Sequence, residues 1–248
     1  MPKREGRTDL ALIADAFTPR TRLLAISDVE YQDGFRNDLV ALGKLCRDNA
    51  ALFVVDASQS LGSIPCDAAA WQADVVMAVG YKWLAGMHGI AALAIDGRVM
   101  ERIRPTAPGR LGVASGWWSE DYTIEWLPDA KRYQTGAPNW LGILALAESL
   151  GLQEELGVAR SFAQGERVID RLIAGLQERG VAIVSDLAPA RRSHILTFTT
   201  GTQDGDASLA RRLAERDVII SLRPRGIRAA AHYWNTTEDA DNLLAALD

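Results

Sequence analysis

The sequence predicts an α/β protein with a mainly parallel sheet over residues 1–157 and a small α+β domain over residues 158–248. Two Val-rich runs, at residues 53–55 and 75–79, end abruptly at polar or turn residues, as buried parallel strands do. In this half of the chain strands alternate with helical segments, which favours βαβ units. In the second half short strands instead surround a few helices, which is typical of an α+β domain.

The elements of the first domain follow from local patterns. Asn37 is placed to cap a helix over residues 38–49, because the apolar side chains of this segment recur at helical spacing and form one stripe. In chain order we expect helix 8–16, strand 23–27, helix 38–49, the strand that ends at Asp56, strand 75–79 before Lys82, a return strand 90–95 and an Ala/Leu-rich helix 139–156.

The elements of the second domain are predicted in the same way. A helix over residues 159–179 ends at Gly180, a residue type that favours the conformation of a helix C-cap. Thr236 and Asp239 have the spacing of a capping box at the start of the last helix. In chain order we expect strands 181–184 and 194–199, a helix near 208–216, strands 218–222 and 227–231, and helix 238–247.

Composition and charge are those of an ordinary globular protein, with 48% apolar and 24% charged residues. The 27 basic residues are outnumbered by 32 acidic ones and form no continuous basic run, so we expect no nucleic-acid partner. No apolar run approaches the ~18 residues of a membrane span, and no signal-peptide core lies near Met1. Cys46 and Cys66 provide no disulfide framework, and the histidines show no metal-ligand spacing. These features predict a cytoplasmic protein without a membrane partner or a metal site.

Two chemically useful side chains follow the Val-rich strands. Asp56 ends the first, and Lys82 follows the second after a Gly-Tyr step, 82 − 56 = 26 residues later. Ligands of open α/β sheets bind beyond the carboxyl ends of the strands, so we expect both side chains at one rim. Pyridoxal phosphate (PLP) needs a lysine for a Schiff base and an acid that keeps its pyridine nitrogen protonated. A simpler role stays open for each residue alone: Lys82 as a surface lysine and Asp56 as a helix N-cap.

The residues around this pair resemble the class V aminotransferases, which are PLP-dependent enzymes of fold type I. Four segments match the family pattern in its order, and together they span nearly the whole chain. They are Asp56 and Gln59 with Gly80-Tyr81-Lys82-Trp83-Leu84-Ala85-Gly86, Val29-Glu30-Tyr31-Gln32-Asp33-Gly34 upstream, Arg132-Tyr133-Gln134-Thr135-Gly136-Ala137-Pro138-Asn139 downstream, and Gly226-Ile227-Arg228 with His232-Tyr233-Trp234-Asn235-Thr236 near the end. Family members carry a further N-terminal part with a Gly/Thr phosphate loop, so the resemblance implies a partial large PLP-transferase domain.

The resemblance implies a role for each matching residue of the cofactor site. Lys82 would be the catalytic Schiff-base lysine, and Asp56 would accept a hydrogen bond from the pyridine nitrogen. Gln59 would bind the ring hydroxyl, with a solvated loop amide as its alternative. Tyr81 would reach the phosphate, and Thr135 would reach the phosphate of the neighbouring subunit in a homodimer.

Arg228 is the candidate for the carboxylate of an amino-acid substrate, because a guanidinium fork matches a carboxylate bidentately. The alternative is an ion pair between Arg228 and a structural acid. Arg223 and Arg225 lie close by in the sequence, and we expect both to be solvated.

The activity implied is PLP chemistry on an amino acid, with transamination, elimination and epimerisation all open. No cysteine follows Cys66, which argues against the sulfur transfer of the family's desulfurase branch. Val79 stands where the family often has a phosphate-binding Ser, and Ala137 where a Thr is expected. These departures and the missing N-terminal part favour the alternative, a catalytically silent truncated fragment that serves as an interaction or dimerisation module.

Overall fold

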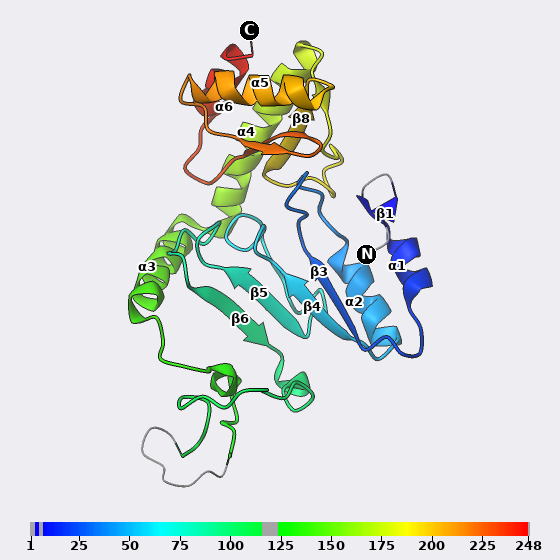
Figure 1. Ribbon diagram of the computed structural model, residues 1–248, viewed down its shortest axis with the longest axis vertical. Coiled ribbons are helices and arrows are strands. Elements are labelled where there is room, and N and C mark those ends of the chain that lie inside the picture. Colours follow the sequence, from blue (N-terminus) through cyan, green and yellow to red (C-terminus); the bar gives the residue numbers. More distant parts are fainter. Residues whose placement is uncertain (1–2, 5–6, 116–123, 248) are drawn as a thin grey trace.

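Two four-stranded sheets and the helices that pack on them make up most of the protein (Figure 1). The structure, a computed structural model, describes residues 3–4, 7–115 and 124–247. A short ribbon of β1 (Lys3–Arg4) and β2 (Arg7–Thr8) precedes the first sheet.

The first sheet has the strand order β3-β4-β5-β6. β3 pairs with β4, and β4 with β5, in parallel, whereas β6 returns antiparallel to β5. The predicted α/β class and the mainly parallel sheet are therefore confirmed. The elements of this half are α1 (Leu10–Ala16), β3 (Leu23–Ser27), α2 (Leu39–Asp48), β4 (Leu52–Asp56), β5 (Val75–Val79), β6 (Ala91–Ile95), the 3-10 helices η1 (Gly97–Val99) and η3 (Ala130–Tyr133), and α3 (Trp140–Leu156).

The alternation of side chains along β4 decides where its last residue points. Phe53 and Val55 are fully buried in the core that also contains Leu42 of α2. Successive side chains of a strand point to opposite faces, so Asp56 points away from this core layer. The carboxylate therefore lies at the carboxyl end of β4, outside the apolar core.

The second sheet has the order β7-β8-β10-β9 and is antiparallel throughout. Its core includes Phe198, Leu176 and Leu213, all fully buried. α3 and α4 meet at Gly157, where φ is +80°; the division into two domains at this point stays a prediction. The elements are α4 (Val158–Glu178), β7 (Ala182–Ile183), β8 (Ile195–Thr199), α5 (Gln203–Ala214), β9 (Ser221–Arg223), β10 (Gly226–Ala230) and α6 (Thr237–Ala245).

The loop after β3 joins the two sheets by hydrogen bonds to β8 and its neighbourhood. Thr197 Oγ1 donates to the Gln32 carbonyl at 2.8 Å, and Ser193 Oγ donates to the Gly34 carbonyl at 2.8 Å. A small apolar cluster of Val29, Ile64, Trp83 and Ile195 fills the junction beside them. These contacts fix β10, which pairs with β8, relative to the turn that carries Lys82.

Several predicted details of the elements are wrong, among them the start of the first helix, which is Leu10 rather than residue 8 because Thr8 belongs to β2. Asp38, not Asn37, caps α2: its Oδ1 accepts from the Ala41 N–H at 3.0 Å, while the Asn37 amide donates to the Ser27 carbonyl at 2.8 Å. α5 begins at residue 203 rather than near 208, because Thr202 caps it and acidic residues occupy its first turn. β9 starts later than predicted, because its pairing with β10 begins only at Ser221. The capping box of Thr236 and Asp239 is confirmed.

Candidate active site

A cavity of about 440 Å³ lies between the turn after β5 and strand β10. The turn contributes Tyr81, Lys82 and Trp83, and β10 contributes Arg228 and Ala230. The other lining residues are Tyr31, Gln59, Ile195, Arg223, His232, Trp234 and Asn235. Residues that are far apart in the sequence thus share one cavity, which brings together three of the predicted cofactor-site residues and the predicted substrate-binding arginine.

The turn that carries Lys82 is closed by close backbone approaches. The Gly80 N–H donates to the Ile90 carbonyl at 2.9 Å, and the Gly86 N–H donates to the Gly80 carbonyl at 2.8 Å. A Cβ on Gly80 would lie 2.7 Å from Ile90 Cγ2, so a larger residue does not fit there without a shift. The glycines therefore hold Lys82 directly beyond the end of β5.

Lys82 is half-buried, and its pKa is lowered from the ordinary value. Burial is the largest cause, Asp56 opposes it, and the nearby Arg228 charge adds to the lowering. The ammonium of Lys82 therefore loses its proton more readily than that of a surface lysine, as a nucleophilic amine requires.

Asp56 lies beside the cavity rather than in its lining. Its Oδ1 accepts from the Ser58 N–H at 2.9 Å, and Ser58 Oγ in turn accepts from the Val79 N–H at 3.2 Å. Residues 58–60 and 62–63 form turns, and no helix begins between β4 and β5, so Asp56 caps no helix there. The carboxylate is close enough to Lys82 to raise its pKa, and Gln59 reaches the cavity itself.

Arg228 and Arg223 both line the cavity. Arg228 Nη1 donates to the Tyr31 carbonyl at 2.7 Å, and among the described residues Arg228 forms no ion pair with an acid. The Nε atoms of both arginines are buried and lack a hydrogen-bond partner within the described residues. Arg223 is thus not simply solvated as predicted, whereas Arg225 is partly exposed and forms an ion pair with Asp33 at 3.0 Å.

A cluster of aromatic rings in the cavity lining, formed by Trp83, His232 and Trp234, was assigned no role from the sequence. His232 stacks on Trp234 with ring centroids 3.5 Å apart and on Trp83 at 5.0 Å. Burial lowers the pKa of His232 to about 4, so its imidazole is neutral near pH 7. The sequence contained an indication of this group, because the aromatic residues from His232 to Trp234 come just after the strand that carries Arg228.

Tyr81 and Thr135 differ in their relation to the cavity. Tyr81 lines it, is 43% exposed and stacks on His88 at 4.2 Å. Thr135 is exposed and does not line the cavity of its own chain. Its contact with a neighbouring subunit stays a prediction.

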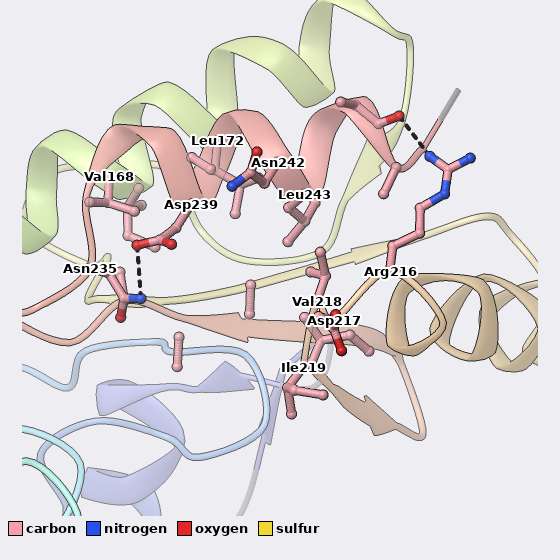
Figure 2. A pocket seen from close by; sticks show the side chains of 18 residues that line it. Val168, Leu172, Arg216, Asp217, Val218, Ile219, Asn235, Asp239, Asn242 and Leu243 are labelled. Atoms are coloured by element: carbon pink, nitrogen blue, oxygen red, sulfur yellow. Dashed lines mark hydrogen bonds between the residues drawn. The ribbon is translucent and has the colours of Figure 1, made fainter.

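A larger cavity of about 680 Å³ lies elsewhere, between α4, α6 and β10 (Figure 2). Its described lining is mostly aliphatic and contains no Lys, Cys or His. The polar groups at its ends already bond within the fold: Arg216 Nη1 donates to the Ala245 carbonyl, and the Asn235 amide donates to Asp239 (Figure 2). The smaller cavity is therefore the candidate site, because the reactive groups gather there.

Within the described ranges, no three side chains of His, Cys, Asp or Glu are grouped as metal ligands would be. Nor does any described helix combine the length and apolar character needed to cross a membrane.

Comparisons with known proteins identify relatives of this chain. The uncharacterized aminotransferase YcbU of Bacillus subtilis is 28% identical over 98% of this chain and 64% of its own length. A cysteine desulfurase of Klebsiella pneumoniae is 28% identical over 98% of this chain and 62% of its own length. The chain thus spans less than two thirds of these relatives.

Solved structures of the cystine C-S lyase C-DES are also similar. One, a complex with the product cysteine persulfide, has a TM-score of 0.87 and 26% identity, and covers 97% of this chain and 65% of that one. Another, a mutant with glycine covalently linked to the PLP cofactor, has a TM-score of 0.86 and 25% identity over 97% of this chain and 64% of that one. The family model "Aminotransferase class-V" matches residues 1–242. The chain therefore belongs to the class V aminotransferase family.

Proposed function

We propose that this chain is the catalytic part of a PLP-dependent, aminotransferase-like enzyme that acts on an amino acid through Lys82. The observation that carries the proposal is the convergence of Lys82, Gln59 and Arg228 on one cavity, with Asp56 beside it. Lys82 and Gln59 come from turns that follow strands of the first sheet, and Arg228 comes from the second sheet.

The residues present fit the cofactor. The Lys82 amine is available for covalent attachment, and Asp56 stands close to it as the acceptor for a protonated ring nitrogen. Gln59 and Tyr81 line the same cavity as donors for the ring hydroxyl and the phosphate. PLP, when bound, supplies an electron sink for the pair of electrons left at the substrate Cα.

The chain's own residues would then perform two tasks. Arg228 holds the substrate carboxylate through its guanidinium, which fixes the Cα of the substrate near Lys82. Lys82 Nζ removes the proton from that Cα as a general base, and its lowered pKa suits this role.

The reaction outcome is a finer question, and the cysteines bear on it. Cys46 is buried in the first core and Cys66 is partly buried; neither lines the cavity. Burial raises the pKa of the Cys66 thiol to about 12, so it is a poor nucleophile. Because the chain has no other cysteine, we propose an outcome that needs no protein thiol, such as transamination, elimination or epimerisation.

We propose further that the working unit is a cytoplasmic homodimer. α3 exposes large apolar side chains on its surface: Trp140 is 66% exposed, Leu141 75% and Leu144 63%. Contiguous apolar surface of this kind favours coverage by more protein. The two free cysteines accord with a reducing compartment.

The alternative is a catalytically silent interaction module. It is favoured by Val79, whose side chain offers no phosphate donor. Each lost hydrogen bond to a charged group weakens binding by about 1.5–3 kcal/mol.

One experiment separates the two functions. The purified chain and a Lys82→Ala variant are titrated with PLP, followed by visible absorbance, and then treated with borohydride. We expect a saturable band in the wild type only, with the reduced pyridoxyl group recovered on the Lys82 peptide. A wild type without the band at saturating PLP would favour the silent module and contradict the enzyme.

A further inference from the structure

We propose that Arg223 binds a second anionic group of the substrate, so that the site selects amino acids with an acidic side chain. The inference rests on the proposed function and names its substrate class. It begins with the pairing of β9 and β10.

The register places the two arginines on the same face of the second sheet. Arg228 lies opposite Ser221, and Gly226 lies opposite Arg223. Arg223 is therefore two residues beyond the direct partner of Arg228. Diagonal neighbours of this kind share a face, with Cα atoms roughly 7–8 Å apart. The two guanidinium groups thus enter the cavity side by side from adjacent strands, and a small ligand can meet both.

Arg223 has no strong partner in the described part of the chain. Its one described hydrogen bond runs from Nη1 to the carbonyl of its neighbour Leu222, at 3.5 Å, the outer limit of such a bond. Its guanidinium packs over the Tyr31 ring, 5.9 Å from the centroid, and its Nε is buried and unpartnered. Leaving a buried polar group without a hydrogen-bond partner costs free energy, so the Arg223 guanidinium favours the binding of a ligand that accepts hydrogen bonds.

The cavity has an excess of positive charge. Its lining contains Lys82, Arg223 and Arg228, but no described Asp or Glu. The Arg223 charge also lowers the pKa of Arg228, after the larger effect of burial, which is the mutual repulsion of two close cations. The α-carboxylate of a substrate occupies one fork. A second carboxylate, or a sulfinate, on the side chain would occupy the other and remove the repulsion.

The anion at Arg223 has a second possible source, the phosphate of the cofactor. The strand pairing favours the substrate, because Arg223 is the neighbour of the arginine assigned to the substrate carboxylate. The two sources are separated by experiment.

The test compares a dianion with a monoanion of similar size. Trp83 and Trp234 line the cavity, so their fluorescence reports binding. The cofactor-free chain is titrated with succinate and with butyrate at pH 7.5. We expect succinate to bind at least tenfold more tightly, about 1.4 kcal/mol. Arg223→Gln should reduce the preference below threefold, and Arg223→Lys, which keeps the charge but not the fork, should give an intermediate value.

Arg225→Gln is the matched control. It removes a charge from the same hairpin, but its guanidinium pairs with Asp33 and does not line the cavity. It should keep the wild-type preference. Circular dichroism of each variant verifies folding.

Two outcomes overturn the inference: a wild type without a succinate preference, and a preference that Arg223→Gln leaves unchanged. If Arg223→Gln also weakens PLP binding tenfold, the second outcome assigns Arg223 to the phosphate of the cofactor. A wild type that forms no Lys82-dependent PLP band but keeps its succinate preference would instead contradict the proposed function and support the two-anion site.

Discussion

His194 makes the stability of this protein depend on pH in a defined window. The ring lies at the junction of the two sheets, where Nδ1 and Ser63 Oγ are 2.8 Å apart. It is 2% exposed and stacks on Phe162 at 5.2 Å, and its Nε2 has no partner among the described residues. Burial is the main cause that lowers the pKa of His194 to about 4, and the charges of His232 and Arg192 act in the same direction.

The magnitude follows from this shift. Above about pH 6.5 the ring is neutral in both the folded and the unfolded chain, so stability has its full value. Between about 6.5 and 4 the unfolded chain binds a proton that the folded chain does not, so stability falls as the pH falls. A difference of 6.5 − 4 = 2.5 pH units at about 1.36 kcal/mol each corresponds to about 3 kcal/mol. His232, whose pKa burial also lowers to about 4, adds to the fall in the same window.

The assay is urea unfolding followed by circular dichroism at several pH values from 7.5 to 4.5. The free energy of unfolding should decrease steadily in the wild type. His194→Gln should lose about half or more of this decrease, although it is less stable at pH 7.5 because the ring packing is gone. His88→Gln is the control, since His88 is exposed and lies outside the junction.

Equal pH dependence in the wild type and His194→Gln would refute this reasoning. It would mean that the imidazole is protonated as easily in the folded chain as in the unfolded one. A free energy of unfolding that stays constant from pH 7.5 to 4.5 would refute it as well.

Two further predictions concern packing. Gly165→Ala on α4 should lower stability, because a Cβ there would lie 2.5 Å from the His194 ring. Gly151→Ala on α3 should instead raise stability by about 1 kcal/mol through helix propensity, because an added Cβ would meet nothing beyond its own helix backbone within 4 Å. Urea midpoints measure both changes, and equal shifts would contradict the packing argument. Leu144→Glu should shift the proposed homodimer toward monomer in sedimentation velocity, whereas Ile219→Glu, at a site 82% exposed on another surface, should not; equal effects would show that α3 is not the interface.

Residues whose environment is set locally were predictable from the sequence. Asp56 and Lys82 could be placed because a Val-rich strand that stops at a polar residue fixes its own end. Arg223 could not be placed in this way, because β9 is three residues long and its exposed or inward side depends on its register with β10. For the same reason the role of His194 was not visible: its partner Ser63 lies 131 positions earlier in the chain.

The candidate site depends on contacts that belong to neither sheet alone. The first sheet fixes the position of Lys82, whereas the second sheet fixes Arg223 and Arg228. Neither sheet alone sets the distance between the lysine and the two arginines. That distance is set by the junction, where the Thr197 and Ser193 hydroxyls bond to the loop after β3 and where His194 meets Ser63. His194 stays neutral in the folded chain down to about pH 4, so acid acts on this junction through the unfolded state and not by protonating the ring in place. The geometry of the cavity should therefore persist for as long as the chain is folded.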